Sequence, residues 1–280
     1  MKIKFLGTAA AEGCPAVFCN CENCKKAARL GGKDLRTRSQ ILVNNDLLVD
    51  LPPDTYYHKM AYSLDLSAVK TLLVTHSHMD HFYTMELSMR GACYAHDMTS
   101  PALKIYCDEG VRKSYEVGSG FEHFAKEVDG AIEWNIVQPF DGFESAGYEI
   151  YALKAHHMAT EKALFYLIKQ GDKSFMQCND TGFVPEENFE FLNKLGIKID
   201  VISLDCTCGK QEIGKNGTHM GAPDCVKVVE LMRKSNFVHE NTKFIVTHFS
   251  HNGGMTHNEL TEYFKPYNVA VAYDGMEVEI

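Results

Sequence analysis

Short apolar runs rich in Val, Ile, Leu, Phe and Tyr recur along the whole chain, and they limit the folds available to it more than any other feature. Runs of this length bounded by polar residues and turn formers are typical of β-strands. We predict strands at residues 2–6, 40–43, 47–49, 70–75, 103–106, 148–155, 164–169, 173–178, 200–204, 243–247 and 269–273.

Apolar residues at helical spacing separate some of these strands, and several of the segments open with a cap residue or Pro. We predict helices at residues 22–30, 55–62, 82–93, 185–195, 223–235 and 257–264. Strand groups in both halves with helices between them favour an α/β protein. The expected architecture is an αββα sandwich, in which two mixed β-sheets pack together and helices cover the outside.

The composition is that of an ordinary globular protein, with 45% hydrophobic and 23% charged residues among 280. No Pro-, Gly- or Ser-rich linker and no charge run divides the chain, so we predict a single domain over residues 1–280. The N-terminal sequence lacks the apolar core of a signal peptide, and no stretch approaches the ~20 apolar residues of a membrane span. We expect a cytoplasmic protein without a membrane partner.

The net charge of −9 disfavours a long nucleic acid as partner, because affinity for a polyanion grows with each Lys or Arg that displaces a counterion. A small phosphate ester remains compatible with an acidic chain, because metal ions can hold it. The oligomeric state is left open between a monomer and a homodimer.

Three predicted strands are followed at once by side chains that bind metal ions, namely His76, Asp180 and His248. The first of them opens the segment His76-Ser77-His78-Met79-Asp80-His81, which has four strong ligands within six residues. In extended chain, positions 76, 78 and 80 point the same way, and the turn into the next segment delivers 81. The alternative is a solvated turn with accidental histidines, which so many specified positions disfavour.

This segment resembles the HxHxDH signature of the metallo-β-lactamase superfamily, and the similarity extends over nearly the full length of the chain. The resemblance implies the metallo-β-lactamase fold and a site with two metal ions. It implies that His76 and His78 bind one ion with a later histidine. Asp80 and His81 would bind the second ion with another late histidine, and a separate aspartate would bridge the two ions.

The later ligands follow from the same resemblance. His156 and His157 are both candidates for the third histidine, and His157 matches better because the family's ligand usually follows the strand after one small or polar residue. Asp180, which precedes Thr-Gly, matches the bridging aspartate, with a turn or helix-capping role as the alternative. His248 matches the last histidine.

Imidazole and carboxylate ligands suit Zn, Mn or Fe, and the sequence does not choose among these metals. Two such ions about 3.5 to 4 Å apart lower the pKa of a bound water, so that it can attack phosphorus or a carbonyl carbon near neutral pH. Asp80 is also a candidate for orienting this nucleophile.

A second metal site is predicted in a loop at about residues 14–30, where Cys19, Cys21 and Cys24 have CxCxxC spacing. Three thiols this close commonly hold Zn with a fourth ligand from elsewhere, for which His251 is the candidate. A redox pair or reduced core cysteines are the alternatives. A closed Cys3His site would be structural, because no coordination position stays open.

The CxCxxC loop together with Thr-His-Phe-Ser-His near the C-terminus is similar to one branch of the superfamily, the phosphoribosyl cyclic phosphodiesterases associated with phosphonate breakdown. In that branch a histidine before a helix donates a proton to the leaving oxygen, and His219 stands at the matching place. Such proton transfer is typically worth ~10² to 10⁴ in rate. The sequence departs from the branch at residues 7–11, at Thr84 and in the longer stretch 157–166.

The remaining cysteines and the histidines His58, His96, His123, His239 and His257 show no pattern of partners and are predicted to be core or surface residues. The predicted function is a dinuclear metal-dependent phosphodiesterase that acts on a small, cyclic nucleotide-like or ribose cyclic phosphodiester. The alternatives are a lactone or thioester hydrolase, a tRNA 3′-end endonuclease and a non-hydrolytic cofactor carrier like the superfamily members linked to quinone-cofactor biosynthesis.

Overall fold

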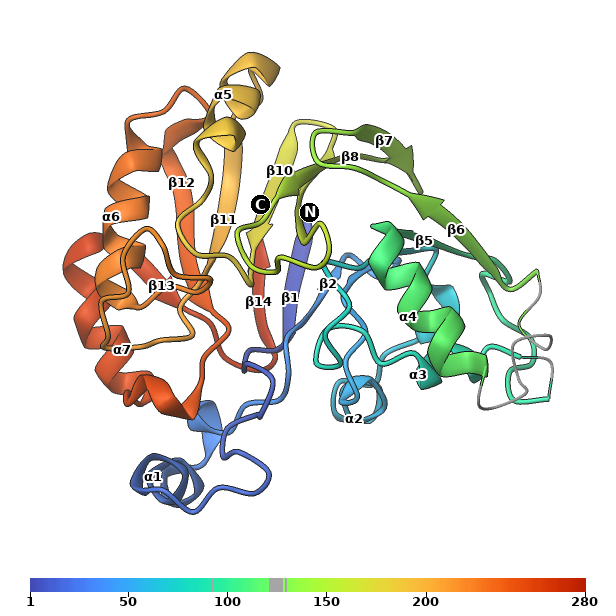
Figure 1. Ribbon diagram of the computed structural model, residues 1–280, viewed down its shortest axis with the longest axis horizontal. Helices are drawn as coiled ribbons and strands as arrows, with labels where there is room; N and C mark the ends of the chain where they lie inside the picture. The colour runs from blue at the N-terminus through green and yellow to red at the C-terminus, as the bar shows by residue number, and fades with distance from the viewer. Residues whose placement is uncertain (92, 121–127, 129) are drawn as a thin grey trace.

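The computed structural model describes residues 1–91, 93–120, 128 and 130–280, and its strands form two seven-stranded sheets (Figure 1). The strands of the first sheet lie in the order β14 (Met276–Glu279), β1 (Lys2–Gly7), β2 (Gln40–Val43), β3 (Leu47–Val49), β4 (Thr71–Leu73), β5 (Leu103–Cys107) and β6 (Ile132–Ile136). Those of the second lie in the order β13 (Val269–Val271), β12 (Val238–Thr247), β11 (Ile199–Asp205), β10 (Lys173–Cys178), β9 (Leu164–Gln170), β8 (Tyr148–Lys154) and β7 (Gly142–Ser145).

Helices cover the outer faces of both sheets. Figure 1 shows α5 (Glu186–Leu195), α6 (Ala222–Arg233) and α7 (His257–Phe264) beside the second sheet, and α2 (Thr55–Ala61), α3 (Met85–Ser88) and α4 (Glu109–Gly120) beside the first. The remaining helix, α1 (Glu22–Leu30), lies apart at one end. Short 3-10 helices occur at Gly32–Asp34, Leu66–Ala68, His251–Gly253 and Lys265–Tyr267. The predicted αββα sandwich is confirmed.

The two sheets are held face to face by side chains that alternate along their strands, as period-two burial requires. Phe5 on β1 and Phe175 on β10 are fully buried and meet edge to face, with ring centroids 6.4 Å apart. Leu48 on β3 and Leu72 on β4 point the other way, into a separate cluster under the outer helices. Each sheet therefore buries both of its faces.

Strand direction brings the predicted ligands to one edge of the sandwich. β3, β4 and β5 are mutually parallel, and so are β10, β11, β12 and β13. The carboxyl ends of parallel strands meet at the same edge of a sheet. His76 after β4, Asp180 after β10 and His248 after β12 come together for this reason.

One predicted helix is wrong in length. Residues 82–93 do not form a continuous helix, because Phe82 pairs with Leu51 as an isolated bridge and the Tyr83 N–H donates to the Leu51 carbonyl. Among the described residues of this range, only Met85–Ser88 is helical. The helix α4 and the strands β6, β7 and β14 were not predicted, and β12 begins five residues earlier than predicted because its first half is polar.

Candidate metal centre

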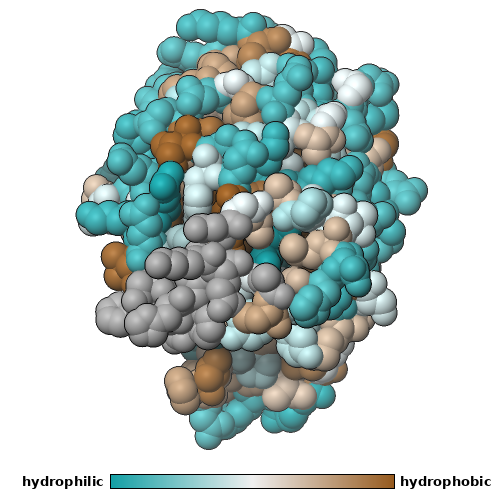
Figure 2. Space-filling view, turned by 90° about the vertical axis from the view of Figure 1, so that its right-hand side faces the viewer, coloured by the Kyte–Doolittle hydropathy of each residue, from teal (hydrophilic) through white to brown (hydrophobic). Residues whose placement is uncertain are grey.

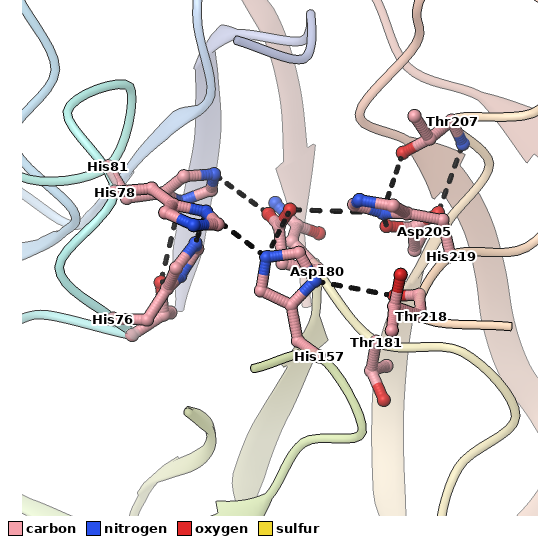
Figure 3. A network of polar contacts seen from close by, with 12 residues as sticks. His76, His78, His81, His157, Asp180, Thr181, Asp205, Thr207, Thr218 and His219 are labelled. Carbon is pink, nitrogen blue, oxygen red and sulfur yellow. Dashed lines mark hydrogen bonds and ion pairs between the residues drawn. The ribbon is translucent and has the colours of Figure 1, made fainter. Parts of the chain in front are cut away.

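The predicted ligands of the first metal ion form a cluster of imidazole nitrogens. His78 Nδ1 lies 2.9 Å from His76 Nε2 and 3.2 Å from His157 Nε2 (Figure 3). His156 does not join them, because its side chain is exposed and its backbone N–H donates to Thr181 Oγ1. The structure thus brings His157, the better of the two sequence candidates, to His76 and His78.

The second group gathers around the Asp180 carboxylate. Asp180 Oδ2 lies 2.7 Å from His81 Nε2 and 3.0 Å from His248 Nε2, while Asp80 Oδ2 is 3.2 Å from His81 Nε2. Asp180 Oδ1 faces the first group, 3.8 Å from His157 Nε2. The two oxygens of Asp180 therefore face different groups, as a bridging carboxylate requires.

Hydrogen bonds on the far side of the rings fix the direction in which four histidines present a lone pair. The Nδ1 atoms of His81 and His76 lie 2.7 Å from Asp50 Oδ2 and 3.0 Å from Thr75 Oγ1. Those of His248 and His157 lie 2.8 Å from Thr207 Oγ1 and 3.4 Å from the Thr218 carbonyl. With the proton on Nδ1, each ring has an acceptor for it, and each Nε2 is left with an unshared pair toward the centre, as in metal-binding histidines.

This donor set fits two metal ions. An imidazole lone pair of His81 facing the Asp180 carboxylate at 2.7 Å is repulsive unless positive charge lies between them. Although burial alone would lower the pKa of His81, the carboxylates of Asp180, Asp80 and Asp50 raise it well above its ordinary value. The cluster therefore attracts positive charge at the place where a cation could bind nitrogen and oxygen ligands together.

Asp50 and Thr75 are functional residues that the sequence analysis missed. Asp50 is fully buried, binds His81, and accepts hydrogen bonds from the backbone N–H of Thr75 at 2.9 Å and from its hydroxyl. Its backbone has a φ of 66°, a left-handed conformation that Asp tolerates better than most residues. An aspartate ending a buried strand, in Leu47-Leu48-Val49-Asp50, was the available signal.

His219 lies beside the second group, held by an acidic partner. Its Nδ1 is 2.8 Å from Asp205 Oδ2 and 3.2 Å from Thr207 Oγ1. Burial alone would lower the pKa of His219, but the Asp205 carboxylate outweighs it and the pKa rises to about 9. The ring is only partly buried, with a quarter of the side chain (25%) exposed. A protonated, accessible imidazole next to the cluster can act as a proton donor.

The loop that carries His219 is fixed by Asp224 in the first turn of α6. The buried Asp224 carboxylate accepts hydrogen bonds from the backbone N–H groups of Ile213, Gly214 and Gly221 at 2.8, 3.1 and 3.1 Å. Glycine is required where this loop touches its neighbours, since a Cβ on Gly182 would lie 1.8 Å from the Gly217 carbonyl oxygen. The loop therefore has little freedom to move His219.

The predicted zinc loop also assembles. The sulfur atoms of Cys19, Cys21 and Cys24 and a ring nitrogen of His251 all lie within 4.8 Å of one another. Cys21 Sγ is 3.4 Å from His251 Nδ1, and this contact lowers the pKa of the thiol to about 6. Four such ligands fit a closed tetrahedral zinc site. His251 comes three positions after His248, so the segment that follows β12 supplies a side chain to each of the two groups.

The remaining histidines agree with their predicted core or surface roles where the structure describes them. His58 is buried and bonded to Thr37 and Gln40, and His257 is buried beside Arg36, 3.2 Å from its Nη2. His96 is exposed, and His239 is partly buried with its Nε2 3.5 Å from Asp200 Oδ1. His123 falls outside the described residues.

The sequence model of the family described as "Beta-lactamase superfamily domain" matches residues 45–249, which include both predicted ligand groups. The chain belongs to this superfamily. The predicted superfamily and its enzyme class, a metal-dependent hydrolase, are thereby confirmed. Among curated proteins, the chain is similar to coenzyme PQQ synthesis protein B of Acinetobacter baumannii (strain SDF). The two are 26% identical over 162 residues, which is 53% of this chain. The match spans about half (50%) of that relative's length.

Solved structures of similar fold cover the whole chain (100%). A diphosphatase from the PhnP family has 19% identity and a TM-score of 0.76, with 98% of that chain covered. Zinc-bound PqqB from Methylobacterium extorquens has 17% identity and a TM-score of 0.77, with 100% covered. The short form of human tRNase Z has 16% identity and a TM-score of 0.68, with 99% covered. At these identities the similarity establishes the fold. Among the described residues, no helix is long and apolar enough to cross a bilayer.

Proposed function

We propose that this protein is a dinuclear metal-dependent phosphodiesterase that hydrolyses a small phosphodiester, cyclic nucleotide-like or ribose cyclic. The observation that carries the proposal is the position of the Asp205–His219 pair next to Asp180, since His219 Nδ1 lies 3.8 Å from Asp180 Oδ1. A phosphodiester has a poor leaving group, so a proton donor adjoining the site of attack is of most use to this class of substrate.

The proposed ligands of the first ion are His76, His78, His157 and Asp180. Those of the second are Asp80, His81, His248 and Asp180. Bound ions, whether Zn, Mn or Fe, would supply a water of lowered pKa and neutralise charge on the phosphoryl oxygens. We assign a third, structural Zn to Cys19, Cys21, Cys24 and His251.

The chain's own residues would do the rest. Asp50, Thr75, Thr207 and the Thr218 carbonyl hold the imidazoles in the required orientation, so no ring has to turn during reaction. Asp80 would orient the attacking water. His219 would give a proton to the leaving oxygen and regain it from solvent, while Asp205 keeps the ring charged before transfer.

The test is turnover by the full chain reconstituted with Zn or with Mn, on bis(p-nitrophenyl) phosphate and on a ribose cyclic phosphate. His219→Ala should lose roughly 10² to 10⁴ in rate on the cyclic ester, whose alkoxide leaves poorly, and much less on the nitrophenyl ester. His239→Ala, at a histidine outside both ligand groups, is the control. Absence of turnover on both diesters by protein with its ions bound would refute the proposal.

A second candidate rests on the relatives named for coenzyme PQQ synthesis. It is a non-hydrolytic protein that binds a cofactor precursor. The full set of ligands together with the Asp205–His219 pair supports hydrolysis instead, because a carrier needs no proton donor. The same assay distinguishes the two, since a carrier would bind ions and turn over neither ester.

A further inference from the structure

A second pocket lies against the outer face of the first sheet, between α2 and the segment around α3. It encloses about 780 Å³, within the size range of small-molecule sites. Most of its walls are apolar, and they are rich in methionine and aromatic side chains, which adapt well to irregular ligands. The apolar lining includes Leu51, Leu72, Tyr83, Met85, Met89 and Met98.

This pocket is distinct from the metal centre. Leu48 and Leu72 at its base belong to the cluster under the outer helices, whereas Val49 and Leu73, the next residues along β3 and β4, face the core between the sheets. None of the proposed metal ligands lines it. Figure 2 looks onto the side of the molecule that carries α3 and α4, where brown and tan side chains break the teal surface.

Two charged residues four positions apart in the sequence, Glu86 and Arg90, line the same pocket. Within the described part of the chain, Arg90 forms no ion pair: its Nη2 donates to the Ser100 carbonyl at 2.8 Å, and its Nε is buried without a hydrogen-bond partner. A guanidinium N–H that is buried without an acceptor costs free energy, which an incoming acceptor would recover. The cation is therefore available to a ligand.

The other charges around the pocket strengthen the preference for an anion. Among the described residues that line the pocket, Glu86 is the single acid against two cations, and burial raises the pKa of its carboxyl. Lys59 also lines the pocket and adds a second positive charge, and its Nζ donates a hydrogen bond to the Leu64 carbonyl at 3.1 Å. A largely apolar pocket whose lining includes the two cations Lys59 and Arg90 is complementary to a molecule with an apolar body and one anionic end.

We propose that this pocket binds an apolar anion, a molecule with an alkyl or aromatic body whose single carboxylate pairs with Arg90. The body would replace water against the Leu and Met side chains, which is favourable in proportion to the apolar area covered. The carboxylate would accept from the guanidinium, whose planar donors match its two oxygens. The site is independent of the proposed hydrolysis.

The test is calorimetric titration of the metal-reconstituted full chain with three probes that share a ten-carbon tail, decanoate, decanol and decylammonium, each kept below its micelle concentration. We expect decanoate to bind with one-to-one stoichiometry and at least tenfold more tightly than decanol, with decylammonium weakest. Arg90→Gln should abolish the preference for decanoate, whereas Arg112→Gln, an exposed arginine paired with Glu116, should keep it.

A second variant, Ala95→Trp, places a large side chain on the wall of the pocket and should weaken the binding of all three probes alike. Equal affinity for the three head groups, or an unchanged decanoate preference in Arg90→Gln, would overturn the proposal, as would the absence of one-to-one binding. Competitive inhibition of diester hydrolysis by decanoate would place the probe in the metal centre and overturn it too. Loss of hydrolysis alone would leave the titration unaffected, so the two proposals fail separately.

Discussion

Asp205 at the end of β11 and His219 in the following loop are joined by a hydrogen bond of 2.8 Å between Oδ2 and Nδ1. The carboxylate of Asp205 is fully buried, whereas the imidazole reaches the surface of the site. A buried anion that faces a partly exposed ring stabilises the charged form of that ring. The pair should therefore govern the pH range over which His219 can donate a proton.

Asp205→Asn should move the high-pH limit of activity downward. Asn cannot stabilise an imidazolium, so the pKa of His219 falls from about 9, and the protonated donor is lost at lower pH than in the natural protein. The pH–rate profile on a ribose cyclic phosphate measures the shift. Asp200→Asn, on the same strand but outside the site, should leave the profile unchanged, and a profile that stays fixed in Asp205→Asn would contradict the role.

Asp50→Asn should weaken metal binding by the two ligand groups around Asp180, although Asp50 itself is not a proposed ligand. Asn at this place removes the charge that orients His81 Nδ1, and such outer partners are typically worth roughly 10- to 100-fold in metal affinity. Competition with a chromogenic chelator measures the affinity. Asp141→Asn, a loop residue, serves as the matched control, and equal affinities in the two variants would argue against the assignment.

Cys24→Ser should remove one zinc equivalent per chain while leaving the ions of the main cluster in place. Cys24 is buried, and its sulfur accepts from the Ala16 N–H at 3.3 Å, so the loop around residues 14–30 should loosen when the metal is lost. Elemental analysis counts the zinc, and limited proteolysis reports the loosening. Cys14 lies in the same loop but outside the ligand set, so Cys14→Ser is the control. Zinc loss in that variant as well would contradict the assignment.

Asp224→Ala should both destabilise the protein and slow the reaction of poor leaving groups. Three backbone N–H groups lose a charged acceptor, which costs about 3 kcal/mol or more of unfolding free energy. Denaturant unfolding measures this cost. The rate on the cyclic ester should fall more than that on the nitrophenyl ester, as for His219→Ala. Asp224→Asn keeps one acceptor oxygen, so its stability and its rate on the cyclic ester should lie between those of the natural protein and those of Asp224→Ala. An equal loss of rate on both esters would indicate a purely structural role.

The two-sheet sandwich could be predicted because short apolar runs recur along the chain. The side chains that the structure brings together could be predicted because the HxHxDH and CxCxxC segments resemble known metal-binding signatures. The helix predicted at residues 82–93 was wrong because the backbone pairing of Phe82 with Leu51, a tertiary contact, outweighs the helical spacing. The helix α4 was missed because three glycines interrupt its pattern. Asp50 was missed because its role depends on a residue 31 positions away.

The two metal-binding groups draw their side chains from both halves of the sandwich, with His76 and His81 mounted on the first sheet and His157, Asp180 and His248 on the second. A half-assembled chain with one sheet formed has at most part of either donor set. An ion that needs both sets can be captured only after the sheets have docked, so ion uptake during refolding should be a late event. The metal ions would then stabilise an interface between the sheets that has already formed, and would not start its formation.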